Sequence, residues 1–365
     1  MYIHLPWCEK QCPYCDFNIS TNKKDGDEEM LISAILRDLE ESKEYISDRK
    51  FVSVYFGGGT PSLTKSKNIE KILLALTTNK MLVKDCEISF EFNPKEVDAS
   101  YLADLSNIGI NRASIGIQSF DNQSLKSLER NHDAAEAFKA IEIISSIKTI
   151  KTSIDLIYGV MGQTLDSFEK DIKTFCSQDV SLLSLYQLTI EPNTIFYKKE
   201  LKTPKDTEIE KMESYAKILL NRSKFYQYEV SSWTKNQAFS KHNMNYWMYG
   251  DFLGLGPGAH SKITSKNSIT RMVKLKQVNS YIKNPTKVSK NKISPDSYDI
   301  DLAMNILRLK DGITFDQLAK RNINLTESFL QKLEYGIASN LLEKNEIKAT
   351  DIGYKFLNDT VNIFS

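Results

Sequence analysis

The sequence lacks any apolar run long enough to cross a membrane. A membrane-spanning helix needs roughly 18 or more consecutive apolar residues, and no run in this chain of 365 residues approaches that length. The first residues also lack the basic region and apolar run of a secretory signal, because Pro6 and Trp7 follow almost at once. We therefore expect a cytoplasmic protein.

The sequence also lacks an excess of charge of either sign. Its 48 lysines and arginines balance 47 aspartates and glutamates, for a net charge of +1, which argues against a surface that binds nucleic acid in general. Cysteine is scarce as well. In a cytoplasmic protein, five cysteines are better explained as thiols or metal ligands than as a disulfide framework. The 41% share of hydrophobic residues is ordinary for a globular protein with a sizeable core.

One segment departs from this charge balance. Residues 262–292 contain nine basic residues and no acidic one. The interpretation that we favour is a solvated, flexible basic linker, because blocks of like charge are usually that. The alternative is a patch that binds carboxylates, an acidic partner or anionic lipid.

Over residues 1–225, apolar and β-branched runs alternate with amphipathic segments. This alternation predicts parallel strands joined by right-handed crossovers, and therefore an α/β fold that contains a partial (β/α)6 barrel. Strands are expected at 2–6, 51–56, 86–92, 112–120, 152–159 and 182–191, and helices at 28–45, 66–79, 98–108, 134–147, 165–176 and 206–224.

The pattern changes after residue 225. Residues 226–294 are expected to form an extension that begins rich in aromatic residues and glycine and then includes the basic segment. Residues 295–365 indicate helices followed by a terminal β-like hairpin over 346–364, as in a small winged-helix-like domain.

Unusual residues follow the expected strands at their carboxyl ends. Cys8 follows the first strand, "GGGTP" follows the second, and "EFNP" ends the third. "QSF", "YGVMGQ" and "EP" follow the next three strands in the same way. Active sites of parallel α/β folds are built at that edge, so we expect the functional site there.

Three of the cysteines, Cys8, Cys12 and Cys15, stand at C-x3-C-x2-C spacing. A structural zinc site normally has four protein ligands, and ferredoxin-type clusters need four cysteines, so neither fits three thiols well. Three thiolates around a [4Fe–4S] cluster, with the fourth iron left for a small chelating ligand, fit best. Cys86 and Cys176 are expected to be plain buried thiols.

C-x3-C-x2-C at this spacing is the signature of the radical S-adenosylmethionine (SAM) superfamily, which this sequence strongly resembles. The motifs that follow, "YFGGGTPS", "SFEFNP", "IGIQSF", "LERNHD" and "IDLIYG", resemble the oxygen-independent coproporphyrinogen III oxidases (HemN) and their relatives over nearly the whole chain. Met161 departs from the proline that is usual in this group, and Trp7 from its phenylalanine. The resemblance implies SAM on the open iron, Thr189 near the adenine, and SAM contacts at Tyr2, Gly58, Gly59, Thr60, Glu91, Gln118, Arg130 and Asp155.

Two features separate the functions within this group. The oxidases carry a further cysteine two residues after the third and an N-terminal extension, whereas here Phe17 stands at that position and the chain begins seven residues before Cys8. Both features resemble the sister family HemW, described as haem chaperones that pass haem to respiratory cytochromes and other haemoproteins. The resemblance therefore implies haem, haem-accepting proteins and an electron donor for the cluster as partners, and no nucleic acid.

The segment "KHNMNYW" (241–247) matches the H-N-x-x-Y-W motif of the HemW family. The resemblance implies His242 as a haem ligand, because an imidazole can bind haem iron axially. Tyr246 and Trp247, with Trp233 and Phe252 near in sequence, could offer flat apolar surface to a porphyrin. The basic segment could meet haem propionates, an acidic partner or a membrane surface.

Three alternatives stay open. The first is a genuine coproporphyrinogen III oxidase, and the second is a radical SAM enzyme that modifies RNA, against which the near-zero net charge argues. The third is a non-catalytic barrel held together by zinc. The sequence also leaves open whether SAM is cleaved in the working cycle or only tunes conformation, and so whether the protein is an enzyme. Among the other histidines, His4 and His260 are expected to be structural and His132 to lie at the surface.

Overall fold

Six parallel strands form an open barrel in the computed structural model, which describes residues 1–265 and 268–365. Neighbouring strands are hydrogen-bonded in chain order, from the first to the sixth. The α/β class and the partial barrel that we expected from the sequence are therefore confirmed. The strands are β1 (Tyr2–Leu5), β2 (Phe51–Gly58), β3 (Leu82–Phe92), β4 (Arg112–Gln118), β5 (Lys151–Tyr158) and β6 (Leu182–Gln187).

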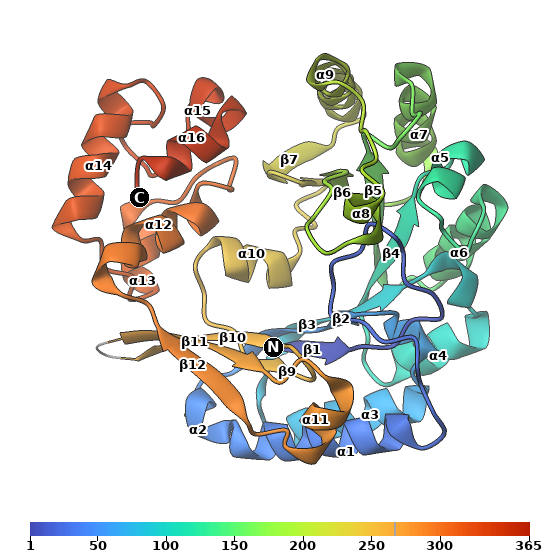
Figure 1. Cartoon of the computed structure of the whole chain (residues 1–365). Helices are drawn as coiled ribbons and strands as arrows, with labels where there is room; N and C mark the ends of the chain where they lie inside the picture. Colours follow the sequence, from blue (N-terminus) through green and yellow to red (C-terminus); the bar gives the residue numbers. More distant parts are fainter. Residues whose placement is uncertain (266–267) are drawn as a thin grey trace.

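Helices cover the outer side of this curved sheet (Figure 1). Their starts are set by side-chain caps: Asp133 and Glu136 form a capping box at α6, and Thr164 and Ser167 form another at α7. The apolar faces of most of these helices pack with the strands into one large core, whereas Phe196 of α8 belongs to a separate, smaller cluster. The helices are α1 (Asp27–Glu41), α2 (Lys43–Ile46), α3 (Ser66–Thr78), α4 (Ala99–Asn107), α5 (Asn122–Ser127), α6 (Ala134–Ser146), α7 (Leu165–Ser177), α8 (Ile195–Lys198) and α9 (Asp206–Arg222).

The chain after α9 extends the barrel sheet at both edges. Strand β8 (Ser232–Thr234) pairs antiparallel with β6 and with β7 (Tyr226–Glu229), whereas β9 (Gly254–Leu255) pairs parallel with β1. Between them, the short helix α10 (Lys241–Trp247) contacts β2 and lies between the barrel and the C-terminal helices (Figure 1). The expected domain division at residues 225 and 294 stays a prediction.

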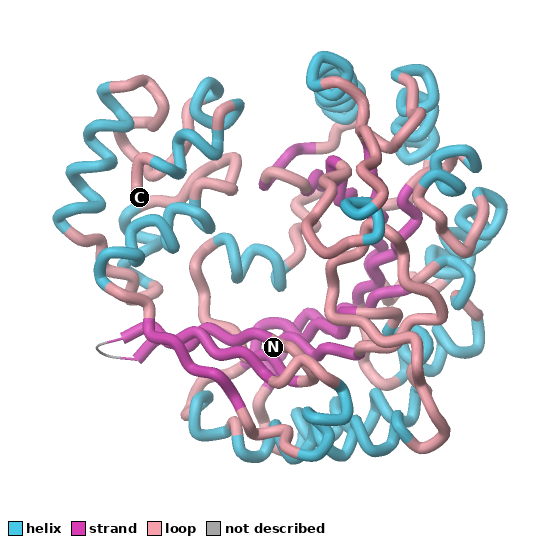
Figure 2. The backbone as a smooth tube through the Cα atoms, in the orientation of Figure 1, coloured by secondary structure: helices cyan, strands magenta, loops and turns pink. Residues whose placement is uncertain are grey.

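The basic segment is ordered secondary structure, so the expectation of a flexible linker was wrong. Strands β10 (His260–Ser265), β11 (Ser268–Lys274) and β12 (Val288–Lys292) form an antiparallel sheet, with α11 (Val278–Lys283) between the last two. Figure 2 shows these residues mostly as strand and helix. Lys266 lies outside the described residues.

Three of the basic side chains in this segment are paired with acids elsewhere in the chain. The Lys262 ammonium contacts Asp251 at 3.2 Å, and Arg271 contacts Asp301 at 2.7 Å. Lys274 pairs with Asp38 of α1, whose side chain is fully buried. These cations hold the small sheet to its neighbours, because a buried charge must find an opposite charge.

The C-terminal residues pack around a second apolar core. Its helices are α12 (Pro295–Ile306), α13 (Phe315–Lys320), α14 (Glu327–Ala338), α15 (Asp351–Lys355) and α16 (Leu357–Asn362). The hairpin expected over 346–364 was wrong: the described residues there form α15 and α16, with isolated bridges at Ile313–Ile347 and Leu342–Ala349. Thr350 caps α15 through the Gly353 amide, and Phe364 turns inward against Phe329.

Among residues 1–265 and 268–365, no helix combines the length and the apolar character needed to cross a membrane.

The buried pair of Lys274 and Asp38 gives a prediction about stability. Replacing Lys274 with Met leaves the Asp38 carboxylate buried with only hydroxyl partners, those of Tyr281 at 2.8 Å and Ser42 at 3.3 Å. We expect the free energy of unfolding, measured by urea titration, to fall by roughly 3 kcal/mol or more.

The matched control is Lys173→Met, which breaks an ion pair with Glu169 on the exposed face of α7. Exposed pairs contribute little, so this variant should stay within about 0.5 kcal/mol of the wild type. Equal losses in the two variants would contradict the structural role that we assign to Lys274.

Candidate cluster and cofactor site

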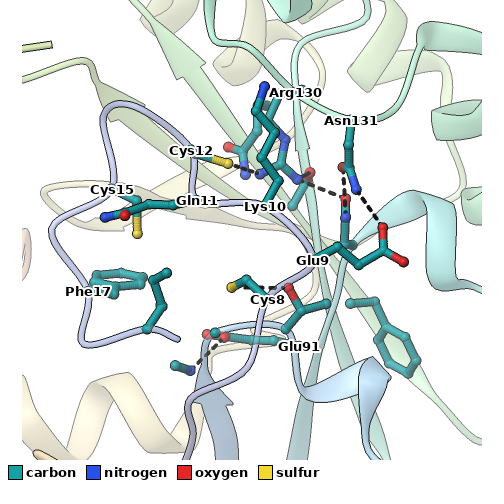
Figure 3. Close-up of a pocket in the computed structure, with 18 of the residues that line it drawn as sticks. Cys8, Glu9, Lys10, Gln11, Cys12, Cys15, Phe17, Glu91, Arg130 and Asn131 are labelled. Atoms are coloured by element: carbon teal, nitrogen blue, oxygen red, sulfur yellow. Dashed lines mark hydrogen bonds between the residues drawn. The ribbon is translucent and has the colours of Figure 1, made fainter. Parts of the chain in front are cut away.

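The carboxyl ends of the barrel strands and the loop after β1 enclose a cavity of about 180 Å³. The loop supplies Cys8, Cys12 and Cys15, whose sulfur atoms face the same space (Figure 3). The strand ends supply most of the other walls, as expected from the positions of the motifs in the sequence. The residues used below that line it are Gly58, Gly59, Thr60, Glu91, Asn93, Ser114, Gly116, Gln118, Arg130 and Asp155.

Backbone hydrogen bonds hold the cysteine loop in place. The Cys8 amide donates to the Ser20 carbonyl at 3.0 Å, and the Cys15 amide donates to the Cys12 carbonyl at 3.0 Å. From the far side, the Phe196 amide of α8 donates to the Pro13 carbonyl at 2.9 Å. The loop is therefore shaped by the protein itself and presents three half-buried thiols.

The donor set of this loop fits an iron–sulfur cluster better than a single metal ion. Among the described residues, no three His, Cys, Asp or Glu side chains converge closely enough to hold one ion. Thiolates that bind separate irons of a cluster stand farther apart than ligands of one zinc. Burial raises the pKa of Cys8 and raises that of Cys15 to about 11, so metal loading must release protons.

Two donors already point at the thiols. The Thr60 hydroxyl lies 3.5 Å from the Cys8 sulfur, and the Arg130 Nη1 lies 3.3 Å from the Cys12 sulfur (Figure 3). The other Arg130 amino group donates to Asn93 Oδ1 at 2.9 Å and to the Gly116 carbonyl at 3.0 Å. Its buried Nε has no hydrogen-bond partner among the described residues, which leaves one donor for a ligand in the cavity.

The glycines at the end of β2 and just after it serve the protein as well as a ligand. A Cβ at Gly58 would come within 2.6 Å of the His4 ring. A Cβ at Gly59 would come within 2.6 Å of the Trp7 carbonyl. Gly58 also has φ 116°, a backbone conformation that side chains disfavour. The glycines therefore dock β2 against β1 and the cysteine loop while still lining the cavity.

Two carboxylates, Glu91 on β3 and Asp155 on β5, face the cavity from inside the barrel. Glu91 accepts from the Tyr55 hydroxyl at 2.7 Å and from the Gly58 amide at 3.2 Å, and Asp155 accepts from Ser114 at 3.0 Å. Burial raises the pKa of Glu91 to about 7 and that of Asp155 to about 6. Neither carboxylate has a positively charged partner in the described part of the chain that is close enough to offset its burial, and a cationic ligand would supply that charge.

The remaining expected contacts divide between the cavity and its surroundings. Gln118 ends β4 with φ 68° and lines the cavity. Thr189 lines a second, adjoining cavity of about 430 Å³ in the barrel interior. Tyr2 is not brought to the first cavity: its hydroxyl bonds His4 Nδ1 at 3.0 Å and its ring stacks on Tyr55.

His242 of α10 is buried behind this site, with its residue 4% exposed. Its Nδ1 lies 3.1 Å from the Ser53 hydroxyl, and its ring stacks on Tyr55 with centroids 4.7 Å apart. Burial holds the pKa of His242 well below its ordinary value. The imidazole is therefore neutral, which is the form that binds metals.

Glu87 of β3 anchors the start of α10. Its carboxylate accepts from the His242 amide at 3.1 Å and the Lys241 amide at 3.2 Å, and it pairs with Arg112 at 2.9 Å. Arg112 in turn donates to the carbonyls of residues 238 and 239. This anchor was missed from the sequence, although the alternation along "CEISFEF" puts Glu87 and Glu91 on one face.

The aromatic residues near the motif do not form one surface. Tyr246 packs edge-on against His242 and Phe252. Trp247 instead packs on the C-terminal core, with the Arg308 guanidinium 4.3 Å from its ring, and Trp233 is buried in β8.

The expected position of His132 was wrong. His132, expected at the surface, is buried, and its Nε2 lies 3.0 Å from the Ile117 carbonyl. The contact that buries it comes from β4, 15 residues earlier, and no local pattern around His132 indicated it.

Comparison with known proteins defines the class first. The model of the radical SAM superfamily matches residues 2–175. The solved coproporphyrinogen III oxidase (HemN) from Escherichia coli superposes with a TM-score of 0.82 at 19% identity, over 100% of this chain and 89% of that one. At this identity the likeness shows the fold. The three-cysteine loop and the barrel together define a radical SAM protein, and that membership implies a [4Fe–4S] cluster and SAM.

The curated relatives then give the particular family. The chain is 37% identical to "Heme chaperone HemW" of Buchnera aphidicola subsp. Acyrthosiphon pisum over 100% of this chain and 97% of that protein. It is 31% identical to the protein of the same name from Escherichia coli, with the same coverage. The chain belongs to the HemW family of radical SAM proteins.

The raised pKa of Glu91 predicts a pH dependence of stability. A folded pKa of about 7 against about 4.5 unfolded means that the folded apoprotein binds more protons, so stability falls as pH rises through this window. Glu91→Gln removes that loss. We expect the variant to gain on the order of 2 kcal/mol relative to wild type between pH 5 and pH 8, measured by urea titration of the apoprotein.

The control is Glu70→Gln, on the exposed face of α3. As a substitution on an exposed helix face, it should change the free energy of unfolding by no more than about 0.5 kcal/mol. If the Glu91→Gln difference did not change with pH, the carboxylate would not be held as the structure shows.

Proposed function

We propose that this protein binds haem and delivers it to haem-accepting proteins. The observation that carries the proposal is the similarity over the full chain to relatives named heme chaperone HemW. The oxidase alternative has less support. The similarity to the oxidase structure, at 19% identity, is a similarity of fold, and a fold does not specify a function. Phe17, 61% exposed beside the cavity, stands where the oxidases have their further cysteine.

The cofactor contacts are part of this proposal. Cys8, Cys12 and Cys15 would hold the [4Fe–4S] cluster, which would bind SAM and supply redox chemistry to it. The chain's own residues orient SAM. Glu91 and Asp155 balance its positive charge, Gln118 and the loop of Gly58, Gly59 and Thr60 position it, and Arg130 balances the charge of the thiolates. Tyr2 supports the SAM site indirectly, through its hydrogen bond to His4 and its stacking on Tyr55.

His242 is the proposed haem ligand. Its neutral imidazole is chemically suited to bind haem iron through a ring nitrogen. In this structure the ring is covered by Tyr55 and Tyr246, and its residue is 4% exposed. A flat porphyrin can reach the nitrogen only if α10 or these covering rings move, so haem binding requires a second position of α10 or of the rings.

The basic segment contributes to the proposed partners through its exposed side chains. Lys276, Lys283, Lys287, Lys290 and Lys292 are exposed, whereas Lys262 and Lys274 are buried in ion pairs. The exposed lysines could meet propionates, an acidic haem acceptor or a membrane surface. An electron donor for the cluster completes the proposed set of partners.

The cluster ligands can be tested against a cysteine in the same chain. Replacing Cys8, Cys12 or Cys15 singly with Ala should remove most of the iron and sulfide from anaerobically reconstituted protein, because each thiolate binds a separate iron. Cys86→Ala, at a buried thiol of β3, should keep the wild-type content. Equal iron and sulfide in all four variants would refute the ligand set.

The haem ligand is tested by titration of the reconstituted protein with haem, followed by the Soret band. His242→Ala should weaken binding roughly tenfold or more and shift the band, because an axial ligand is lost. His260→Ala, at an exposed histidine of β10, should bind like the wild type.

Three other outcomes have defined meanings. Unchanged affinity in His242→Ala would remove His242 as the ligand, and no specific haem binding by the wild type would reject the chaperone function. Decarboxylation of coproporphyrinogen III by the same preparation would restore the oxidase alternative.

A further inference from the structure

One side chain of β2, Tyr55, touches both the cofactor site and the haem motif. Its hydroxyl donates to Glu91 Oε1 at 2.7 Å, and its ring stacks on the His242 imidazole at 4.7 Å with the planes 21° apart. The strand pattern explains the position, because Ser53, Tyr55 and Gly57 alternate onto the barrel side of β2. Tyr55 is therefore a shared wall between the two sites.

The helix that carries His242 is held against the same two strands. Ser53 of β2 bonds the imidazole, and Glu87 of β3 accepts from the first amides of α10. Glu91 lies four residues after Glu87 on the same face of β3. Any change at Glu91 thus acts on a surface to which α10 is attached.

The charge of SAM is the change to consider. SAM carries a sulfonium and an ammonium group, whereas Glu91 of the apoprotein has a pKa near 7 because it is enclosed. A cation placed beside it favours the ionised carboxylate. A hydroxyl that donates to a carboxylate makes a stronger hydrogen bond than one that donates to a neutral acid. SAM therefore fixes Tyr55, and Tyr55 holds the ring on which His242 stacks.

Haem binding requires the stack of Tyr55 on His242 to open, whereas SAM stabilises it. His242 is 4% exposed beneath Tyr55 and Tyr246, so a porphyrin reaches its nitrogen only after this stack opens. We infer that Tyr55 is a positioning residue through which SAM and haem oppose each other: bound SAM holds α10 closed and weakens haem binding. This inference rests on the proposed haem function, and by linkage haem must weaken SAM binding by the same factor.

The test compares haem titrations of the cluster-loaded protein with and without SAM. In the wild type, saturating SAM should raise the haem dissociation constant about fivefold or more. In Tyr55→Phe, which keeps the stacked ring and loses the hydroxyl, haem affinity should be the same with and without SAM. The matched control is Tyr158→Phe, which loses a hydroxyl that also donates to a glutamate at 2.7 Å, Glu213 of α9; it should keep the full SAM effect.

A second readout needs no haem. Hydrogen exchange of the α10 amides in the cluster-loaded protein should slow on addition of SAM in the wild type and in Tyr158→Phe, and should not respond in Tyr55→Phe. This readout separates the hypothesis of haem binding from the hypothesis that SAM acts on α10 through Tyr55. If haem does not bind but SAM still protects α10 through Tyr55, the haem function fails and the link stands.

Two results would overturn the inference. One is a hydrogen-exchange rate of the α10 amides that is the same with and without SAM in the wild type, whether or not haem binds. The other is a SAM effect on haem affinity or on α10 exchange that persists unchanged in Tyr55→Phe, because the signal would then pass through other residues.

Discussion

Two buried carboxylates on one strand determine where their partners pack against the open barrel. Glu87 and Glu91 lie on the same face of β3 and point inward, where an unpaired carboxylate would be strongly destabilising. Glu87 is neutralised by Arg112 and by two amides of α10, and Glu91 is held by Tyr55 and the Gly58 amide. Each set of partners comes from distant sequence. Satisfying these two groups therefore places α10 at one end of β3 and shapes the cofactor cavity at the other.

The features that the sequence predicted well are those with local causes. Hydrophobic periodicity located the strands and helices of the barrel, for example a strand expected at 112–120 that forms as β4 over Arg112–Gln118. The cavity could be placed because carboxyl ends of parallel strands meet at one edge. Cys8, Cys12 and Cys15 could be grouped because they lie within eight consecutive residues. None of these inferences required a contact between distant segments.

The features that the sequence misjudged depend on distant partners. The basic segment looked like a solvated linker because its acids lie elsewhere: Asp38 on α1, Asp251 after α10 and Asp301 on α12. The burial of the motif histidine could not be predicted from the sequence, because Ser53 and Tyr55, which cover it, lie almost 190 residues earlier. Charge and motif patterns show which residues are present. Whether a residue is buried depends on the distant strand against which it packs in the fold.

The same scaffold can serve an oxidase and a chaperone because the barrel supplies only the cofactor chemistry. The fold is shared with the HemN structure, and a shared fold does not specify a function, so side chains at the barrel wall can contribute to the difference. Here the helix that carries the HemW motif is stacked directly on that wall, one tyrosine away from Glu91. A cofactor bound in the cavity can therefore act on cargo by its charge alone. Such a protein would retain the cysteines and the SAM site of an enzyme while using them to control when haem is held.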